Sequence, residues 1–439
     1  MILIKNGRII DPKTNRDDVL DIVIDGGKIV DIGKYGRNDD YEYIIEATGY
    51  VVAPGFVDVH THFRDPGFPE KEDIYTGAKA AAHGGFTSVV MMANTNPPID
   101  CPEVLDQVLD KGKETGIHVY SVACISKGMA GKELTDMDAL KEHGAVGFSD
   151  DGKPIESMEL MLEAMRKAKE LNAPLSLHEE AAELIGVAGI NDGPIAKKLG
   201  IEKGAPALSE DIMVARDCML AVSTGAPVHF QHISSMNAVR QIELAKSMGA
   251  HVTAEVTPHH FTLTEEAVET YGTMAKMNPP VRSVRDRFEV LNGLKRGVID
   301  MIATDHAPHT AEEKEKPFPQ APSGIIGLET ALGLAECYLI RKGHITLTKL
   351  IELLSWAPAK LYGLDAGYLA PGGPADLVIF SEQEPWEVKD LMSRSQNTPF
   401  LGQTLYAKVK YTICDGQIVY SDSELHPNRP SEFGDGREK

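Results

Sequence analysis

The chain has 439 residues, of which 42% are hydrophobic and 25% charged, and its formal net charge is −21 at pH 7. These fractions are ordinary for a globular protein, and no apolar run approaches the roughly 18 residues that a membrane span needs. So large a negative charge would be repelled by nucleic-acid backbones and anionic membranes, so neither is an expected partner. An anionic small molecule would need a local cluster of positive charge inside its site.

The start of the chain does not look like a signal peptide. It reads MILIKNGRIIDP, which reaches a charge at Lys5 and a turn at Asn6-Gly7, and it lacks a basic start followed by an apolar core. The five cysteines are scattered and fit neither a disulfide framework nor a cysteine zinc site. We therefore expect a cytoplasmic protein with free thiols.

Both ends of the chain predict β-structure. Alternating apolar residues in ILIKNGRII and LDIVIDGGKIVDI are interrupted at Asn6-Gly7 and Asp25-Gly26-Gly27, which favour hairpin turns. Near the other end, ADLVIF precedes LYAKVKYTICDGQIVY, with a further hairpin turn at Asp415-Gly416. Isolated hairpins are marginally stable in water, so we expect the two ends to share a sheet. The prediction is a small composite β-sandwich domain from residues 1–53 plus 365–439.

Between these ends, short apolar runs alternate with helical stretches, which is the pattern of a parallel α/β fold. Two helical stretches, residues 156–171 and 238–250, place apolar residues at intervals of three and four. The apolar runs are VAPGFVDVH, TSVVMMANT, IHVYSVACI, AVGFSDD, PLSLHEE, PVHFQHIS, HVTAEVTPHH and DMIATDHAP. Eight runs predict a TIM-type (β/α)8 barrel over residues 54–364.

Histidines and aspartates gather at the ends of these runs. In chain order they are His60 and His62, Asp150 and Asp151, His178, His232, His259 and His260, and Asp305, His306 and His309. In a parallel barrel the catalytic groups lie at the carboxyl ends of the strands, so these side chains are candidates for one site. His60 and His62 are two residues apart, and on an extended strand both imidazoles would point to the same side. Imidazoles and carboxylates without a thiolate suit a catalytic Zn²⁺, although other divalent ions could substitute.

Several motifs spread over residues 58–330 resemble one family. They are DVHTHFRDPG, ANTNPP, GFSDDGKP, QHISS, KMNPPVR, ATDHAPH and APSGIIGLET. Together they resemble the amidohydrolase superfamily and, within it, the type I dihydroorotases. The resemblance implies a hydrolase that reversibly converts (S)-dihydroorotate and water into N-carbamoyl-L-aspartate, a reaction of de novo pyrimidine (UMP) biosynthesis.

The resemblance also implies two zinc ions per subunit, bridged by a carboxylate and a water or hydroxide. The implied metal residues are His60, His62, Asp151, His178, His232 and Asp305. Many relatives use a carboxylated lysine as the bridge, but AVGFSDDG contains no lysine, and Asp151 is expected to take its place. Asp150 is less favoured because neighbouring residues on a strand point to opposite faces.

The chemistry expected from such a site is hydrolysis of a ring amide. A divalent ion lowers the pKa of bound water to about 7, and Asp305 would act as ligand and as general acid/base. Arg64 lies two residues beyond His62, on the same side if the strand geometry continues, and its guanidinium offers a fork for a substrate carboxylate. The resemblance adds Asn94, Asn278, His309 and the backbone near Gly327 as substrate contacts. Asn278 precedes Pro279-Pro280 and could instead simply shape a turn.

Two alternatives remain open at this point. The chain could be another cyclic amidohydrolase, such as a hydantoinase, allantoinase or dihydropyrimidinase, although the missing lysine and Arg64 argue against these. It could also be an inactive, dihydroorotase-like partner of aspartate transcarbamoylase, although every ligand position is filled. The family implies a homodimer, and association with aspartate transcarbamoylase is open. Residues 310–320 could be a solvated loop or a lid over the site.

Overall fold

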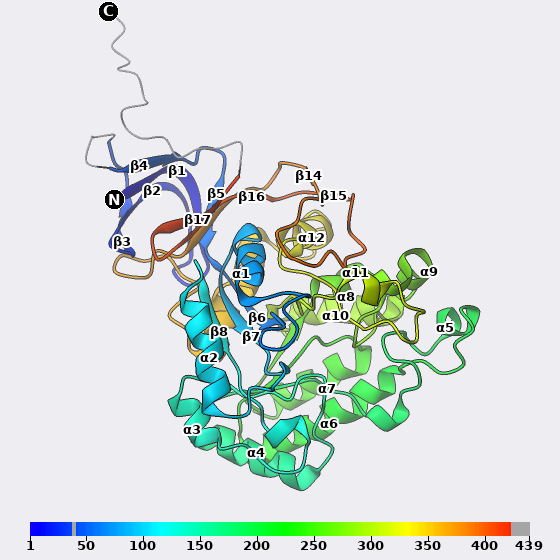
Figure 1. Cartoon of the computed structure of the whole chain (residues 1–439). Helices are drawn as coiled ribbons and strands as arrows, with labels where there is room; N and C mark the ends of the chain where they lie inside the picture. The colour runs from blue at the N-terminus through cyan, green and yellow to red at the C-terminus, as the bar shows by residue number, and fades with distance from the viewer. Residues whose placement is uncertain (37–40, 423–439) are drawn as a thin grey trace, which may run out of the picture.

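The computed structural model describes residues 1–36 and 41–422, and Figure 1 shows their arrangement. Residues 423–439, which belong to the predicted sandwich, lie outside the described residues. Two regions stand out: a sheet built from both ends of the chain, and a set of parallel strands surrounded by helices. Among the described residues, none of the helices is long and apolar enough to cross a membrane.

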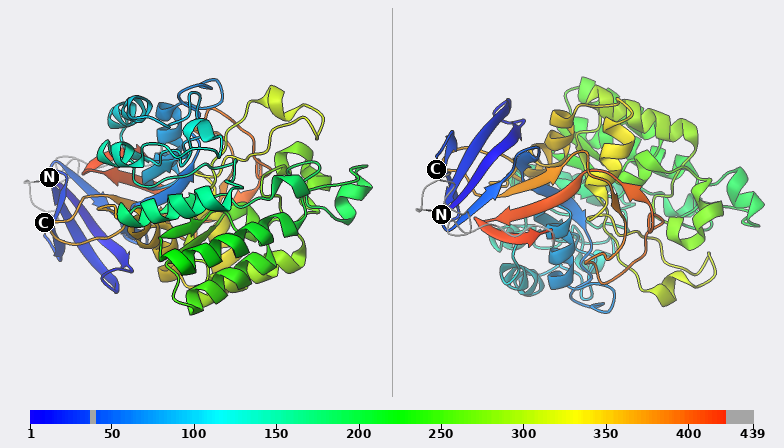
Figure 2. Two further views of the ribbon diagram at one scale, coloured as in Figure 1. Left: turned by 90° about the horizontal axis from the view of Figure 1, so that it is seen from below. Right: turned by 90° about the horizontal axis from the view of Figure 1, so that it is seen from above.

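Strands from both ends of the chain form one mixed sheet, which we call the terminal sheet. Its order is β17-β16-β13-β5-β1-β2-β3, with β4 paired to β1. The strands are β1 (Ile2–Asp11), β2 (Arg16–Asp25), β3 (Lys28–Gly33), β4 (Tyr43–Glu46), β5 (Val51–Pro54), β13 (Leu377–Ser381), β16 (Lys408–Cys414) and β17 (Gln417–Ser421). Antiparallel pairing of β5 with β13 joins the N-terminal strands to the C-terminal ones. Figure 2 shows β1 to β3 at one end of the molecule, away from most of the helices.

The turns of the terminal sheet follow the sequence in two of three places. Asp25-Gly26-Gly27 joins β2 to β3, and Asp415-Gly416 joins β16 to β17 with positive φ at both residues. The predicted turn at Asn6-Gly7 is wrong, because both residues lie inside β1 at a bulge in its pairing with β2. A Cβ on Gly7 would lie 2.4 Å from Cγ2 of Val52, so close packing explains this glycine.

The parallel strands form two groups, β6-β7-β8 and β12-β11-β10-β9. They are β6 (Phe56–Thr61), β7 (Phe86–Met91), β8 (His118–Ser121), β9 (Leu175–Leu177), β10 (Val228–Phe230), β11 (Val252–Val256) and β12 (Met301–Ile302). Parallel bridges connect the groups at both edges: Phe148 bridges to Ala123 and to Leu175, and Thr61 bridges to His306. The coarse prediction of an α/β fold with parallel strands agrees with this arrangement.

Two of the eight runs predicted as strands differ in the structure from that prediction. The run that begins at Val52 is divided between two sheets, since β5 joins the terminal sheet and β6 joins the parallel strands. Gly55 stands at the division, where a Cβ would lie 2.1 Å from Oγ1 of Thr87. The fourth run, AVGFSDD, forms only the bridges at Phe148 and has no named strand.

Helices pack around the parallel strands (Figure 2). The α-helices are α1 (Ile74–His83), α2 (Pro102–Lys113), α3 (Met137–Glu142), α4 (Met158–Glu170), α5 (Pro194–Lys198), α6 (Ala207–Thr224), α7 (Met236–Ser247), α8 (Pro258–Thr262), α9 (Ala267–Tyr271), α10 (Val284–Arg296), α11 (Ala311–Lys314), α12 (Ala331–Ala335), α13 (Leu347–Leu354) and α14 (Trp356–Tyr362). Short elements are η1 (Lys127–Met129), η2 (Ala182–Leu184), η3 (Gly272–Ala275), η4 (Glu336–Ile340), β14 (Trp386–Glu387) and β15 (Thr404–Leu405). Both predicted helices form, as α4 and α7. Ser157 and Ser235 cap their first turns, and each helix buries its apolar stripe.

Candidate metal centre

Side chains from the first and last parallel strands meet at one buried point. His60 lies on β6, and His62 and Asp305 follow β6 and β12. Nε2 of His62 is 3.0 Å from Oδ1 of Asp305, and Nε2 of His60 is 3.5 Å from the same oxygen. Their ligand atoms lie within 4.8 Å of one another, which is close enough for one metal ion to reach all three.

A second group adjoins the first. Nδ1 of His178 is 2.9 Å from Nε2 of His232, and Oδ1 of Asp151 is 3.7 Å and 3.8 Å from these two nitrogens. The same Oδ1 is 3.5 Å from Nε2 of His60, so Asp151 lies between the two groups. Asp150 faces the other way and accepts hydrogen bonds from the backbone N–H groups of Ile125 and Ser126. The structure therefore brings together all six residues proposed as metal ligands, with Asp151 rather than Asp150 at the centre.

The backbone at two of these residues adopts an unusual conformation. His232 has a φ of 32° and Asp305 a φ of 50°, in the region that non-glycine residues rarely occupy. His232 lies two residues after the end of β10 and Asp305 three residues after the end of β12, and the turn there directs their side chains across the strand ends. Such conformations cost free energy and persist where surrounding contacts hold them, which is common at functional sites.

Buried polar atoms that have no hydrogen-bond partner show whether the residues of the centre would fit a metal ion. Among the described residues, Nε2 of His60 and Oδ1 of Asp151 are buried and make no hydrogen bond. A buried polar atom without a partner costs free energy, and both atoms lie where the two groups meet. Imidazole nitrogens and carboxylate oxygens are also a donor set that divalent zinc accepts. The residues present therefore fit a metal centre.

The electrostatics of the centre come from opposite charges in a buried place. Burial disfavours the charged form of His60, but Glu255, Asp151 and Asp305 outweigh burial and raise the pKa of its imidazole well above the ordinary value. Burial likewise opposes ionisation of Asp151, yet His60 and the neighbouring histidines lower the pKa of that carboxyl well below its usual range. Without a metal, the cluster thus balances its charges with protons, and a cation could replace them.

Arg64 reaches the centre by a different route from the one predicted. The strand β6 ends at Thr61, and Arg64 has a φ of 53°, so extended geometry does not continue and that part of the prediction is wrong. A turn instead directs the guanidinium toward the loop after β12. There Nε donates to the carbonyl of Pro308 at 3.3 Å, and Nη2 lies 3.5 Å from Nε2 of His309. The cation therefore stands at the rim of the centre beside His309.

The two asparagines contact the candidate ligands directly. Oδ1 of Asn94 is 2.9 Å from Nδ1 of His62, and its amide donates to Oδ2 of Asp151 at 3.1 Å. The amide of Asn278 lies 3.4 Å from Nε2 of His178 and donates to Oε2 of Glu180 at 2.6 Å, and its own Oδ1 is buried without a partner. Both amides thus lie at the centre, where they can contact ligands, substrate or both.

The structure places His309 beside Arg64, and Gly327 beside His306. Nε2 of His309 is 2.8 Å from the carbonyl oxygen of Ser323, and its Nδ1 is buried without a hydrogen bond. The N–H of Gly327 donates to Nδ1 of His306 at 3.2 Å, and its carbonyl accepts from the N–H of Thr330. The backbone groups of Gly327 are therefore engaged in this structure.

Residues 310–320 are held by two buried lysines. The segment starts with α11, which has a capping box between Thr310 and Glu313. Nζ of Lys314 donates to the carbonyls of Pro322 and Gly324, at 3.0 Å and 3.1 Å. Nζ of Lys276 donates to the carbonyls of Phe318 and Ala321, at 2.6 Å and 2.7 Å. Burial lowers the pKa of Lys314 to about 7. The segment is thus anchored at several backbone positions, unlike a loop that only solvent surrounds.

Sequence reasoning missed two acidic residues at the centre. Glu255 lies on β11 with no exposed surface, and its Oε1 is 2.6 Å from Nδ1 of His60. Glu180 follows His178 by two residues, and its Oε2 is 3.5 Å from Nε2 of that histidine. A signal for Glu255 existed, because a glutamate in the middle of a buried apolar strand needs a buried partner. His259 and His260, left open by the sequence, lie on α8, and burial lowers the pKa of His259 to about 3.

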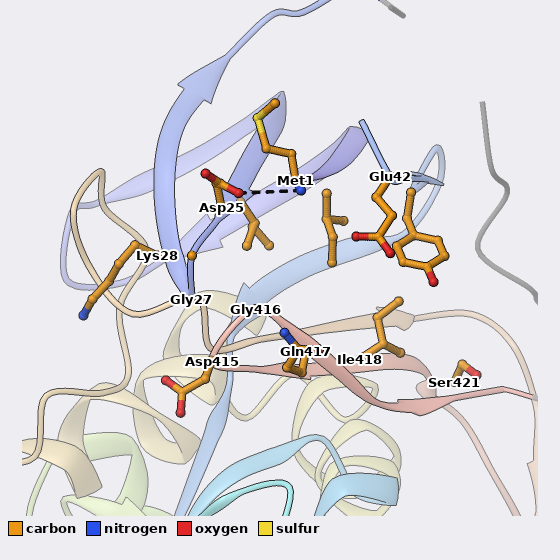
Figure 3. A pocket seen from close by; sticks show the side chains of 14 residues that line it. Met1, Asp25, Gly27, Lys28, Glu42, Asp415, Gly416, Gln417, Ile418 and Ser421 are labelled. Carbon is orange, nitrogen blue, oxygen red and sulfur yellow. Dashed lines mark ion pairs between the residues drawn. The ribbon is translucent and has the colours of Figure 1, made fainter. Parts of the chain in front are cut away.

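A separate groove of about 810 Å³ lies in the terminal sheet (Figure 3). It runs between the β2–β3 turn, the start of β1 and the β16–β17 hairpin. Its walls include Asp25, paired with the N-terminal amine of Met1 at 3.6 Å, and Glu42. The groove contains none of the histidines of the metal centre, so we do not assign the chemistry to it.

Comparison with protein families identifies two matching models. One, described as Dihydro-orotase-like, matches residues 49–251, and the other, described as Amidohydrolase family, matches residues 290–420. Among curated proteins, the dihydroorotase of Clostridioides difficile (strain 630) is 56% identical over 421 residues, which cover 96% of this chain and 100% of the relative. The dihydroorotase of Lactococcus lactis subsp. lactis is 51% identical over 95% of this chain and 99% of its own.

Among solved structures, hydantoinases and dihydropyrimidinases have a similar fold. The L-hydantoinase (dihydropyrimidinase) of Arthrobacter aurescens has a TM-score of 0.85 at 24% identity and covers 97% of each chain. The D-hydantoinase (dihydropyrimidinase) of a Thermus species has a TM-score of 0.79 at 26% identity, covering 98% of this chain and 97% of its own. These likenesses extend over both the terminal sheet and the parallel strands.

Proposed function

The chain belongs to the dihydroorotase family of amidohydrolases, and we propose that it interconverts (S)-dihydroorotate and N-carbamoyl-L-aspartate with two zinc ions bound at the strand ends. Curated dihydroorotases that are 50–56% identical over nearly its whole length support the activity. The reaction is hydrolysis and formation of a cyclic amide in de novo pyrimidine biosynthesis. The observation that carries the proposal is Asp151, a carboxylate between two histidine groups where a lysine is absent.

We propose that one zinc ion is held by His60, His62 and Asp305, and the other by His178 and His232. Asp151, within 3.8 Å of nitrogens from both groups, would bridge them. When bound, the pair would supply an activated water as nucleophile and polarise the amide carbonyl. A carboxylate bridge needs no carbon dioxide, unlike a carboxylated lysine. The two buried atoms without partners support this assignment.

The residues of the chain have distinct parts in the reaction. Asp305 would take the proton from the attacking water and return it to the departing ring nitrogen, since its Oδ1 lies beside one proposed zinc site, 3.0 Å from Nε2 of His62 and 3.5 Å from Nε2 of His60. Arg64 and His309 receive the substrate carboxylate, since a guanidinium binds a carboxylate with two parallel hydrogen bonds. Asn94 and Asn278 orient the bound ring, and the backbone near Gly327 contacts the ring amide.

Arg64 also separates this proposal from the hydantoinase alternative. Hydantoin, dihydrouracil and allantoin rings lack the carboxylate of dihydroorotate, so a cation held at the rim of the centre favours the charged ring. The arginine is partly buried, and desolvation lowers the pKa of its guanidinium, so an anionic partner would stabilise its charge there. Among the residues described, the ligand set is complete, which argues against an inactive partner of aspartate transcarbamoylase.

We also propose a closed barrel and a composite sandwich domain for this chain. A closed (β/α)8 barrel over residues 54–364 is supported by the bridges at Phe148 and at Thr61–His306. A composite β-sandwich domain from residues 1–53 plus 365–439 is supported by the pairing of β5 with β13. A cytoplasmic homodimer, and association with aspartate transcarbamoylase, remain predictions.

The first experiment compares substrates. Zinc-loaded protein and the variant Asp151→Ala are assayed by ultraviolet absorbance on dihydroorotate, hydantoin, dihydrouracil and allantoin at equal concentration. We expect turnover of dihydroorotate alone, and its collapse in the variant because the bridge between the two groups is lost. Turnover of a neutral ring would favour a hydantoinase, and no turnover would favour the structural partner.

The direction of the reaction gives an independent check. Ring closure from ionised carbamoyl aspartate consumes a proton, so the equilibrium should shift toward dihydroorotate as the pH falls. Initial rates measured in both directions between pH 6 and 9 give this ratio. A ratio that does not change with pH would rule out the assigned reaction, whatever the residues involved.

A further inference from the structure

We propose that Glu255 is the positioning residue of the metal centre: its carboxylate fixes the ring of His60 and the backbone of His232, and so joins the two ligand groups. This inference rests on the proposed function, because it concerns residues that would hold the metal. Glu255 is separated from His60 by 195 residues in the sequence, and the parallel strands bring the two together.

The geometry at one carboxylate oxygen carries the argument. Oε1 of Glu255 is 2.6 Å from Nδ1 of His60 and accepts the backbone N–H of His232 at 3.1 Å. His60 belongs to the first ligand group and His232 to the second, so one oxygen contacts both. His232 is also the residue with a φ of 32°, and the bond to its N–H supports that unusual backbone conformation.

The bond to Nδ1 decides which nitrogen of His60 can bind a cation. A carboxylate only accepts hydrogen bonds, so Nδ1 carries the proton and Nε2 presents its lone pair. Nε2 is the atom that faces Asp151 and Asp305, each at 3.5 Å, and it makes no hydrogen bond. A second partner on the far nitrogen of a ligating histidine commonly fixes its ring and its tautomer in this way.

The other carboxylate oxygen extends the support deeper between the strands. Oε2 of Glu255 is 2.9 Å from Nε2 of His229, whose Nδ1 is 2.9 Å from Oγ1 of Thr253. Glu255 and His229 are almost completely buried, so solvent does not compete for these bonds. His229 of β10 and Thr253 of β11 therefore hold the carboxylate of Glu255 in place. Glu255 in turn holds the two ligand residues His60 and His232.

The isosteric variant Glu255→Gln tests the proposal, with metal affinity as the readout. Its amide keeps the size of the side chain but carries no charge, and one of its two ends donates instead of accepting. We expect the apparent dissociation constant for Zn²⁺, measured by competition with a chromophoric chelator, to rise about 10–100-fold. At saturating zinc, kcat should recover much of its value. Nitrogen-15 NMR of the metal-free protein, at a pH high enough for His60 to be neutral, should show His60 losing its fixed Nδ1–H tautomer.

Glu336→Gln is the matched control, since Glu336 is a buried carboxylate paired with Arg341 and not with a candidate ligand. It should leave the zinc affinity unchanged. If Glu255→Gln does not fold, His229→Asn replaces it, because that change keeps the carboxylate and removes its support at Oε2. A smaller loss of affinity is then expected.

Other outcomes separate the possible failures. Unchanged zinc affinity and an unchanged His60 tautomer in a folded Glu255→Gln protein would overturn the inference and leave Glu255 a structural residue. Loss of one of the two zinc ions, with the affinity for the other intact, would also overturn the inference, because Glu255 would then itself be a ligand. If the wild-type protein neither bound zinc nor converted dihydroorotate, the proposed function would fail instead.

Discussion

The terminal sheet and the ends of the parallel strands are both buried, but their interiors differ in kind. In the terminal sheet, isoleucines such as Ile9, Ile379 and Ile413 are fully buried against one another. At the strand ends, histidines and carboxylates are buried together, and some of their atoms lack partners. The first arrangement stabilises the fold through apolar burial, whereas the second costs stability unless a ligand completes it. The contrast teaches that stability and chemistry depend on different parts of this chain.

The largest effect should come from the strand ends. Asp305→Asn keeps the shape of the side chain but removes the proton acceptor and one proposed ligand. Since general acid–base groups contribute about 10²–10⁴-fold to rate, we expect kcat to fall by at least about 10³-fold. The thermal midpoint of the metal-free protein is measured beside it, as the check that the variant is folded at the assay temperature. Activity within tenfold of the wild type would remove Asp305 from the mechanism.

In the terminal sheet we expect the opposite, which is a loss of stability without a loss of activity. Ile413→Ala deletes a fully buried side chain on β16, and such deletions cost about 2–5 kcal/mol of unfolding free energy. Urea denaturation measures this loss, with Ile413→Val, at about 0.5–1.5 kcal/mol, as the graded control. The kcat of the folded variant should match the wild type. A large fall in kcat at temperatures where the variant is folded would show that the two regions are coupled.

Arg64 sharpens the contrast within the centre itself. Arg64→Gln removes the cation but leaves the proposed metal ligands in place. A hydrogen bond to a charged group is worth about 1.5–3 kcal/mol, so KM for dihydroorotate should rise roughly 10–100-fold. Zinc content serves as the control and should stay at the wild-type level. An unchanged KM would mean that the substrate carboxylate binds elsewhere.

Residue patterns predicted the centre better than the connections between elements. Alternation along an extended chain disfavoured Asp150, and in the structure the two side chains point in opposite directions, one to the centre and one to the backbone of Ser126, although no named strand forms there. That Asp151 binds metal stays a prediction. Arg64 was placed by extending the same alternation past Thr61, and it failed because the backbone turns there.

The remaining errors have the same physical origin. Asn6-Gly7 has the composition of a turn, but its glycine is required by the nearby Val52, a contact that sequence spacing does not reveal. The run before His60 was predicted as one strand, although Gly55 lets it pass between two sheets. Glu255 was missed because its partners are distant in sequence. Long-range packing decides each of these cases.

The smallest predicted effect concerns a buried carboxylate outside the centre, at the start of η4. Burial, helped by nearby Glu382, raises the pKa of Glu336 from its ordinary 4.5 to about 7. Between these pH values the folded protein keeps a proton that the unfolded chain has lost, so this group makes the unfolding free energy fall as the pH rises.

The variant Glu336→Gln tests this effect, because its side chain cannot ionise and its unfolding free energy should lack this fall with pH. Relative to the wild type, the variant should therefore gain stability between pH 5 and pH 8, which urea midpoints at both values measure. An equal difference at the two pH values would mean that Arg341 keeps Glu336 ionised throughout. In that case a cation would balance a buried carboxylate outside the centre as well as those inside it.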